Sequence, residues 1–215
     1  MAAASLPWLT VEQMVEADRL AVEDFGIDLL QMMEHAGSLL AELTHRLAPQ
    51  GRVVVLAGAG NNGGGGLCAA RHLVNRGREV SIVLASDRPG PAARHHLATL
   101  DAMGVETGVD PGDAPVVVDA LVGYGLSGPL RGRAAELVQA VSGRFAVSLD
   151  FPSGHGEIGG LSPAVTLTLA LPKAGLRNVR PLYLADLGLP PALWARMGLA
   201  VPALFGRSRI LEITP

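Results

Sequence analysis

A glycine-rich turn is the segment of this sequence best suited to bind a charged ligand. Residues 58–66 read GAGNNGGGG and follow a short run at 52–57 that is rich in β-branched residues. Glycines let the backbone turn sharply, approach a ligand closely and direct several N–H groups at an anion. The turn matches the GxGxxG pattern between a strand and a helix, so it predicts a pocket for a phosphate-bearing, nucleotide-like ligand. A tight turn without a ligand is the alternative interpretation.

Two asparagines, Asn61 and Asn62, lie inside this turn. Their side-chain carbonyl oxygens can bind a monovalent cation or accept a hydrogen bond from a ligand hydroxyl. Asparagine also tolerates the left-handed conformation of tight turns, so a structural role is the alternative. No Lys-Ser or Lys-Thr pair follows the glycines, which excludes a Walker A loop.

Two aspartates end two further predicted strands. Asp119 precedes a second glycine loop at 123–129, and Asp150 precedes the sequence Phe-Pro-Ser-Gly. Ligands of open α/β sheets bind outside the carboxyl ends of the strands, so both carboxylates and the glycine turn are expected at one edge. Two carboxylates at one site need a cation between them, or one must take up a proton. One aspartate could therefore hold a metal ion while the other does acid–base work, although each could instead be a helix cap.

Other polar side chains carry weaker predictions. Lys173 could reach a phosphate, but a surface position is the default expectation for a lysine. Cys68 is expected to be a small core residue rather than a nucleophile. Four histidines are expected on exposed helix surfaces: His35, His72, His95 and His96.

Alternating strand and helix patterns predict how these residues are positioned. Strands are expected at 52–57, 79–85, 115–119, 145–150, 164–171 and 180–188, with helices at 64–75, 91–104 and 131–143 between them. Such alternation predicts a mostly parallel sheet with helices on both sides. Two helices are expected before the first strand, one over 11–25 behind a Thr10–Gln13 capping box and one capped by Asp28.

The first of these helices has an unusual apolar face. The helical period places Asp18 on the same face as an apolar stripe. A charged residue there is unexpected for a helix that packs against a core. The predicted stripe comprises Val11, Met14, Val15, Val22 and Phe25.

The bulk composition excludes several protein classes. Of the 215 residues, 49% are hydrophobic and 17% charged, against a usual charged share of about 25%, so the chain is expected to fold as one α/β domain over residues 1–215. A net charge of −3 gives no basic surface for nucleic acid or anionic lipid. One cysteine excludes an internal disulfide, and no signal peptide or membrane span is expected, so a cytoplasmic location is predicted.

Several motifs taken together resemble the YjeF N-terminal domain family. They lie at 9–37, 53–77, 116–132, 149–154 and 170–176. The motifs occur in the family's order, and the resemblance extends from about Leu9 to Pro190. The resemblance implies a three-layer α/β/α Rossmann-like sandwich with a mostly parallel sheet and two N-terminal helices. The best-known members are NAD(P)H-hydrate epimerases, which interconvert the R and S forms of NADH and NADPH hydrated at C6 of the nicotinamide ring (NAD(P)HX). A dehydratase then repairs these nucleotides; the chain is too short to be expected to contain it.

The resemblance also implies roles for individual residues. Asn62, Asp119 and Ser153 would bind a potassium ion, and Asp150 would contact the substrate as the acid–base group. The implied substrate-binding residues are Asn61, Asn62, Gly63, Gly64, Gly65, Gly123, Tyr124, Gly125, Leu126, Ser127, Gly128, Pro129 and Asp150. A homodimer is expected on resemblance alone.

Two departures from the family pattern bear on activity. The family turn usually reads GNNGGDG, but Gly65 stands at the aspartate position. The stretch at 155–165 is shorter than usual and lacks an LDADTG-like run. These departures make a catalytically inactive nucleotide-binding or protein-interaction module the second hypothesis. The glycine turn also allows a Rossmann dehydrogenase, which is a weaker third hypothesis.

Overall fold

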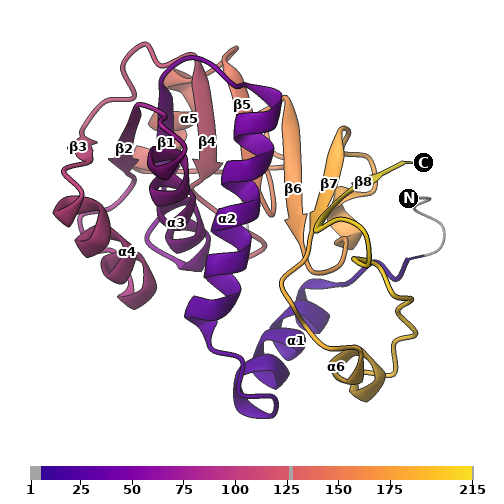
Figure 1. The fold of residues 1–215 in the computed structure, drawn as a ribbon. Coiled ribbons are helices and arrows are strands. Elements are labelled where there is room, and N and C mark those ends of the chain that lie inside the picture. Colours follow the sequence, from indigo (N-terminus) through magenta and orange to yellow (C-terminus); the bar gives the residue numbers. More distant parts are fainter. Residues whose placement is uncertain (1–5, 126–127, 215) are drawn as a thin grey trace.

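One mostly parallel sheet organises the computed structural model, which describes residues 6–125 and 128–214 (Figure 1). Within these residues eight strands pair in the order β3-β2-β1-β4-β5-β6-β7-β8, and only the β7–β8 pair is antiparallel. The strands are β1 (Val53–Ala57), β2 (Val80–Leu84), β3 (Glu106–Gly108), β4 (Val116–Ala120), β5 (Phe145–Leu149), β6 (Val165–Leu169), β7 (Leu182–Ala185) and β8 (Ile210–Ile213).

Helices cover both faces of the sheet. They are α1 (Val11–Glu23), α2 (Leu29–Leu47), α3 (Asn61–Asn75), α4 (Pro91–Ala102), α5 (Gly132–Ala140) and α6 (Pro191–Arg196), with a short 3₁₀ turn, η2 (Ala174–Leu176). Helices α2, α3 and α4 lie on one face and α5 on the other, whereas α1 and α6 lie together beyond the ends of β6 and β7 (Figure 1). This arrangement confirms the predicted α/β/α sandwich with two N-terminal helices.

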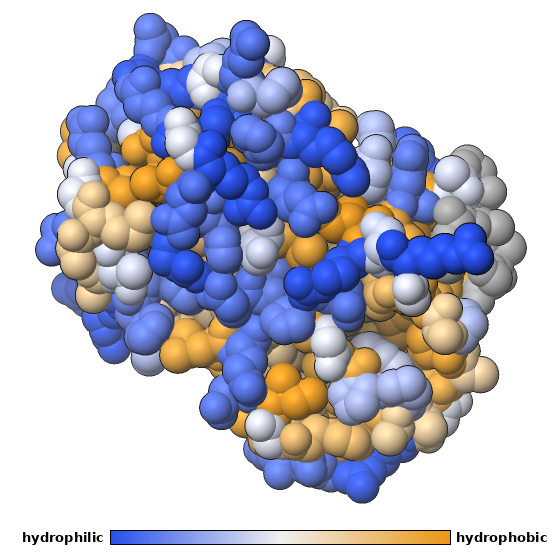
Figure 2. Space-filling view, viewed as in Figure 1, coloured by the Kyte–Doolittle hydropathy of each residue, from blue (hydrophilic) through white to orange (hydrophobic). Residues whose placement is uncertain are grey.

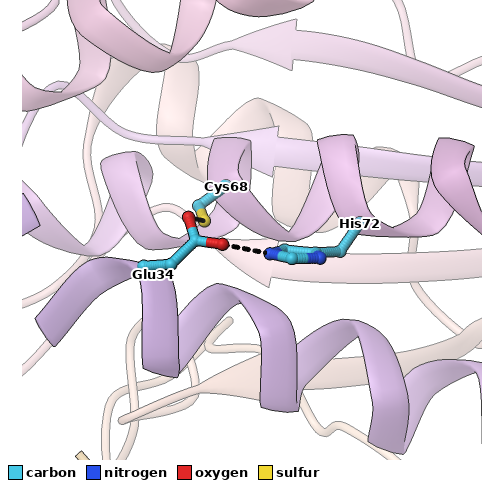
Figure 3. A group of neighbouring side chains, drawn as sticks. All are labelled: Glu34, Cys68 and His72. Atoms are coloured by element: carbon cyan, nitrogen blue, oxygen red, sulfur yellow. Dashed lines mark hydrogen bonds and ion pairs between the residues drawn. The ribbon is translucent and has the colours of Figure 1, made fainter. Parts of the chain in front are cut away.

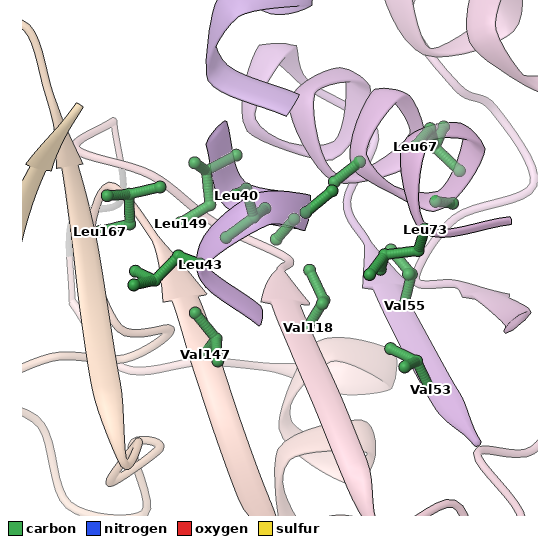
Figure 4. Packing of buried hydrophobic residues seen from close by; sticks show 14 of the residues in the cluster. Leu40, Leu43, Val53, Val55, Leu67, Leu73, Val118, Val147, Leu149 and Leu167 are labelled. Carbon is green, nitrogen blue, oxygen red and sulfur yellow. The ribbon is translucent and has the colours of Figure 1, made fainter. Parts of the chain in front are cut away.

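The central strands are buried on both sides because each face has its own helical layer. Alternate side chains of β1 point to opposite faces, so Val53 and Val55 pack with α2 and α3 while Val54 and Leu56 pack with α5. Figure 4 shows Leu40 and Leu43 of α2 packed over the strand side chains on the sheet face that α2 and α3 cover. Every residue of β1 and β4 is buried, which explains why both strands are almost continuous runs of apolar residues.

Some predicted boundaries and positions are wrong. Helix α3 begins at Asn61 rather than at Gly64, so both asparagines belong to its first turn. His96 is buried in α4 rather than solvated, and burial lowers its pKa. His72 is partly buried and paired with Glu34.

The buried face of α1 also differs from the predicted stripe. Val11, Val15 and Val22 are exposed, whereas the buried side chains are Met14, Ala17, Leu20 and Ala21. The physical reason is that α1 packs against α6 and its surrounding loops instead of lying on the sheet. Figure 2 shows apolar residues at the surface in the lower part of the molecule, where α1 and α6 lie.

Candidate active site

The carboxyl ends of three neighbouring strands bring the predicted residues together. Strands β1, β4 and β5 are adjacent and parallel, and they end at the glycine turn, Asp119 and Asp150 respectively. The glycine turn is packed so closely that side chains do not fit: a Cβ added at Gly58 would overlap the carbonyl oxygen of Leu121, and one at Gly63 would overlap that of Gly58. Close packing rather than φ freedom therefore explains these two glycines.

A cavity of about 370 Å³ opens at this edge of the sheet. One wall comes from α1 and α2 and is mostly apolar, although it includes Asp18. The other comes from the segments that follow the strands and carries the polar groups of Asp150 and Lys173. Of the predicted substrate-binding residues, those that line the cavity are Asn61, Asn62, Gly65, Gly123, Tyr124, Gly125 and Asp150. A pocket this size, with a few convergent polar groups, is suited to a small-molecule ligand.

The remaining predicted residues lie elsewhere. Gly63 and Gly64 are buried within α3, and Pro129 is exposed outside the cavity linings. Gly128 lines a second hollow of about 420 Å³, which shares Tyr124 and Lys173 with the first. The predictions for Leu126 and Ser127 fall outside the described residues.

Asp119 is a fully buried carboxylate held by neutral donors. Its oxygens accept hydrogen bonds from Ser148 Oγ (2.7 Å), Ser153 Oγ (2.5 Å) and Ser153 N (2.9 Å). Burial raises the pKa of Asp119, and these hydrogen bonds oppose that rise. Among the described residues no lysine, arginine or histidine pairs with this carboxylate, so its charge has no fixed counter-ion.

Asn62 lies beside the loop that follows Asp119. A Cβ added at Gly123 would be 3.4 Å from Asn62 Oδ1, so the amide rests against that backbone. The Asn62 Nδ2 atom is buried and has no hydrogen-bond partner among the described residues. Asp119, Ser153 and Asn62 thus supply carboxylate, hydroxyl and amide oxygens, which are donors that a hard cation prefers. The donor set fits the predicted potassium ion.

Asp150 pairs with a lysine that was predicted to be on the surface. Lys173 Nζ lies 2.6 Å from Asp150 Oδ1, and the two side chains are 2% and 5% exposed. Lys173 also donates to the Leu169 carbonyl oxygen at 2.6 Å, and its backbone bridges to Leu9, which fixes its position. Asp150 itself has a φ of 64°, a strained conformation for a residue with a side chain. The surface prediction for Lys173 is wrong because the N-terminal segment around Leu9 pairs with the backbone at Lys173 and covers it.

A second acidic group, missed as a site residue, lines the same cavity. Asp18 of α1 accepts a 2.8 Å hydrogen bond from the Tyr124 hydroxyl. Burial raises the pKa of Asp18, while the Tyr124 hydrogen bond and the Lys173 charge lower it. Burial also raises the pKa of Tyr124, so the phenol remains protonated at neutral pH. The unusual position of Asp18 on an apolar helix face was the sequence signal for this contact.

The family that this geometry suggests can be tested by comparison. The sequence profile described as YjeF-related protein N-terminus matches residues 29–175. The chain belongs to this family. The resemblance inferred from the sequence motifs is therefore confirmed.

Relatives of the chain within the family have consistent names. A protein of Dehalogenimonas lykanthroporepellens named NAD(P)H-hydrate epimerase is 47% identical, and the match covers 89% of this chain and 86% of that protein. One of the same name from Rhodopirellula baltica is 39% identical, with 81% and 79% covered. A bifunctional NAD(P)H-hydrate repair enzyme, Nnr, from Thermanaerovibrio acidaminovorans is 37% identical over 83% of this chain and 40% of its own length.

The family fold is also seen in a solved structure. The crystal structure of a yeast protein, ynu0, superposes with a TM-score of 0.83 at 26% identity, covering 97% of this chain and 100% of that one. Within this fold, Gly65 lines the cavity where the family pattern has aspartate, and a Cβ added there would be 2.8 Å from Leu149 Cδ2. The Leu149 side chain thus takes part of the space that an aspartate would need.

Proposed function

We propose that this chain interconverts the R and S epimers of hydrated NADH and NADPH, an isomerase activity in nicotinamide nucleotide repair. The observation that carries the proposal is the buried Asp150–Lys173 pair on the polar wall of the cavity. It lies beside a glycine turn suited to phosphate, in a chain 47% identical to a protein named NAD(P)H-hydrate epimerase. Together these features supply an anion cradle and a positioned proton-transfer pair.

Asp150 is the proposed acid–base group. Epimerisation at a carbon that bears a hydroxyl and a ring nitrogen requires proton transfer and relief of developing charge. The Asp150 carboxylate can accept the proton and return it, while the Lys173 ammonium stabilises negative charge at the same position. Because both side chains are buried and Lys173 is anchored to the Leu169 carbonyl, the pair is oriented before substrate binds. In ring opening, Asp150 would take the hydroxyl proton as the carbon–nitrogen bond breaks and return it on closure. In the loss and return of water, Asp150 would instead have to be protonated and donate to the leaving hydroxyl.

The apolar wall suits the ring of the substrate. Met14 of α1, together with Leu29 and Met32 of α2, faces the polar groups across the cavity. Tyr124 stands between the two hollows, and Asp18 holds its hydroxyl. We infer that the nicotinamide-derived ring lies against Tyr124, because the carbons of this partly saturated ring can make apolar contact with an aromatic side chain.

A potassium ion is proposed at Asn62, Asp119 and Ser153. The support is a buried carboxylate without a cationic partner among the described residues, together with the hydroxyl and amide oxygens of Ser153 and Asn62 nearby. When bound, the ion would offset the Asp119 charge and attract the nucleotide phosphates. Hydrogen bonds from Ser148 and Ser153 hold the Asp119 carboxylate in place at this site.

The cellular context remains a proposal as well. Relatives named bifunctional repair enzymes support a functional coupling between this activity and a dehydratase. A cytoplasmic location and a homodimer are proposed with them. Within the described residues, no helix combines the length and apolar character needed to span a bilayer.

The direct test supplies the R epimer of NADHX to the folded chain in potassium buffer and follows formation of the S epimer by chromatography. We expect acceleration in the native chain, and loss of it in Asp150→Asn, which keeps the shape but not the charge. No acceleration above the spontaneous rate would refute the proposal. The second candidate function, a non-catalytic binding module, is favoured by Gly65 alone; melting-point stabilisation by another nucleotide, without epimerisation, would support it.

A further inference from the structure

A second group of chemically reactive side chains lies between α2 and α3. Glu34 of α2 meets Cys68 and His72 of α3, and one donor atom from each lies within 4.8 Å of the others (Figure 3). Glu34 Oε1 is 2.7 Å from His72 Nε2, and Glu34 Oε2 is 3.3 Å from Cys68 Sγ. None of the three lines either of the two cavities described above. The cluster is therefore distinct from the proposed active site.

Helix geometry explains why the three side chains converge. Cys68 and His72 are four residues apart, so they lie on one face of α3. Glu34 reaches them from α2, which packs directly against that face. Gly37 makes this approach possible, because a Cβ added there would be 2.6 Å from Cys68 Sγ. The two helices therefore present sulfur, nitrogen and oxygen donors to a common point.

A cationic nitrogen already occupies that point. Arg71 Nη2 contacts Glu34 Oε2 and lies 3.2 Å from His72 Nε2 and 3.8 Å from Cys68 Sγ. The Arg71 side chain is 23% exposed, so it can turn out to solvent without crossing the core. The Arg71 guanidinium thus lies among the three donor atoms, and its side chain is exposed enough to be displaced towards solvent.

We propose that Glu34, Cys68 and His72 form a binding site for a divalent transition metal ion of the zinc class, which displaces the Arg71 guanidinium. A thiolate, an imidazole and a carboxylate are the ligand types that zinc takes, and three protein ligands leave one position for water. On binding, the Cys68 sulfur–hydrogen bond breaks, a sulfur–metal bond forms, and the proton passes to solvent. His72 donates its Nε2 lone pair, and neither metal nor sulfur changes oxidation state.

The probe is cobalt(II), because a cobalt–thiolate bond gives a charge-transfer band in the near ultraviolet. The full chain, stripped with a chelator, is titrated with cobalt(II) and then with zinc(II). We expect the thiolate band in the native chain and its loss when zinc replaces cobalt. Zinc at about 100 times its dissociation constant should raise the melting temperature by about 5–10 °C. Arg71→Gln should bind zinc up to about fivefold more tightly, since the competing ion pair with Glu34 is part-exposed and is removed.

Matched variants locate the ion. Cys68→Ser and His72→Ala should lose the band and the zinc-dependent stabilisation, whereas His95→Ala, a change at an exposed histidine of α4, should keep both. Circular dichroism and cooperative unfolding establish that each variant is folded. Absence of the band in both the native chain and Arg71→Gln would overturn the proposal and leave an ion pair that joins two helices. Unchanged affinity in Cys68→Ser and His72→Ala would overturn it too, because the metal would then lie elsewhere.

Discussion

Lys173→Met is expected to destabilise the chain strongly, because it leaves the Asp150 carboxylate buried without its ammonium partner. The two side chains are 2% and 5% exposed, so solvent cannot replace the lost interaction. Removing one member of a buried pair costs about 3–5 kcal/mol, which corresponds to a fall in melting temperature of about 6–20 °C in a chain of this length. Asp150→Asn should cost less, because a neutral amide keeps the hydrogen bond from Lys173 and leaves a cation that can reach Leu169.

Urea unfolding of both single variants and the double variant measures this coupling. The double variant is expected to be more stable than the sum of the two single losses predicts, since it buries no unpaired charge. Arg133→Met is the matched control: Arg133 pairs with Glu136 at 3.2 Å, but these side chains are 39% and 65% exposed, and the expected loss is below about 1 kcal/mol. A Lys173→Met loss as small as the control loss, or strict additivity in the double variant, would refute the reasoning.

Three further predictions concern the cavity. Burial raises the pKa of Asp18, so the folded chain binds this proton more tightly than the unfolded chain does. The stability that this group contributes is therefore lost as pH rises above about 4. In urea unfolding, Asp18→Asn should flatten this decline of stability with pH, and an unchanged slope would contradict the prediction. Asp119→Asn places an amide among hydrogen-bond donors, so the free energy of unfolding in urea should fall by about 1–3 kcal/mol. The substitution should also abolish any potassium dependence of epimerisation. Full stability together with retained potassium dependence would exclude the proposed ion site. Gly65→Asp adds a Cβ 2.8 Å from Leu149 Cδ2 and should lower the free energy of unfolding by about 1–3 kcal/mol. The same substitution should cost less in a chain that already carries Leu149→Val. Equal costs in the two backgrounds would show that Leu149 is not the obstacle.

The sequence predicted the sheet because its central strands are short β-branched runs followed by glycine or aspartate. Strands β3 and β8 were missed because β3 has only three, largely exposed residues and β8 pairs antiparallel at the sheet edge. A period-based prediction needs a run long enough to repeat, which β3 does not offer, and the β8 sequence Ile-Leu-Glu-Ile does not alternate apolar and polar residues. The local pattern thus determined the middle of the sheet but not its edges.

The candidate site was predicted in part for a similar reason. Asp119 and Asp150 follow strands, and strand ends of a parallel sheet meet, so their proximity follows from topology. Lys173 follows β6, which pairs parallel with β5, so its proximity to Asp150 follows from topology too. Its burial does not, because it depends on the bridge to Leu9, more than 160 positions away in the sequence. Tertiary contacts of this kind have no local signature. Asp18 had one, a charge on an apolar face, but its partner Tyr124 could not be identified from spacing.

The assembly of the cavity from distant segments has a consequence during synthesis. The glycine turn at 58–66 leaves the ribosome about 110 residues before Lys173, an interval of roughly 5–20 s at ordinary elongation rates. Asp150 is absent for most of that interval, and its lysine is absent for all of it. A nascent chain therefore cannot hold the nucleotide early, and ligand-dependent resistance to a protease should first arise in chains released at or beyond the 170–176 segment.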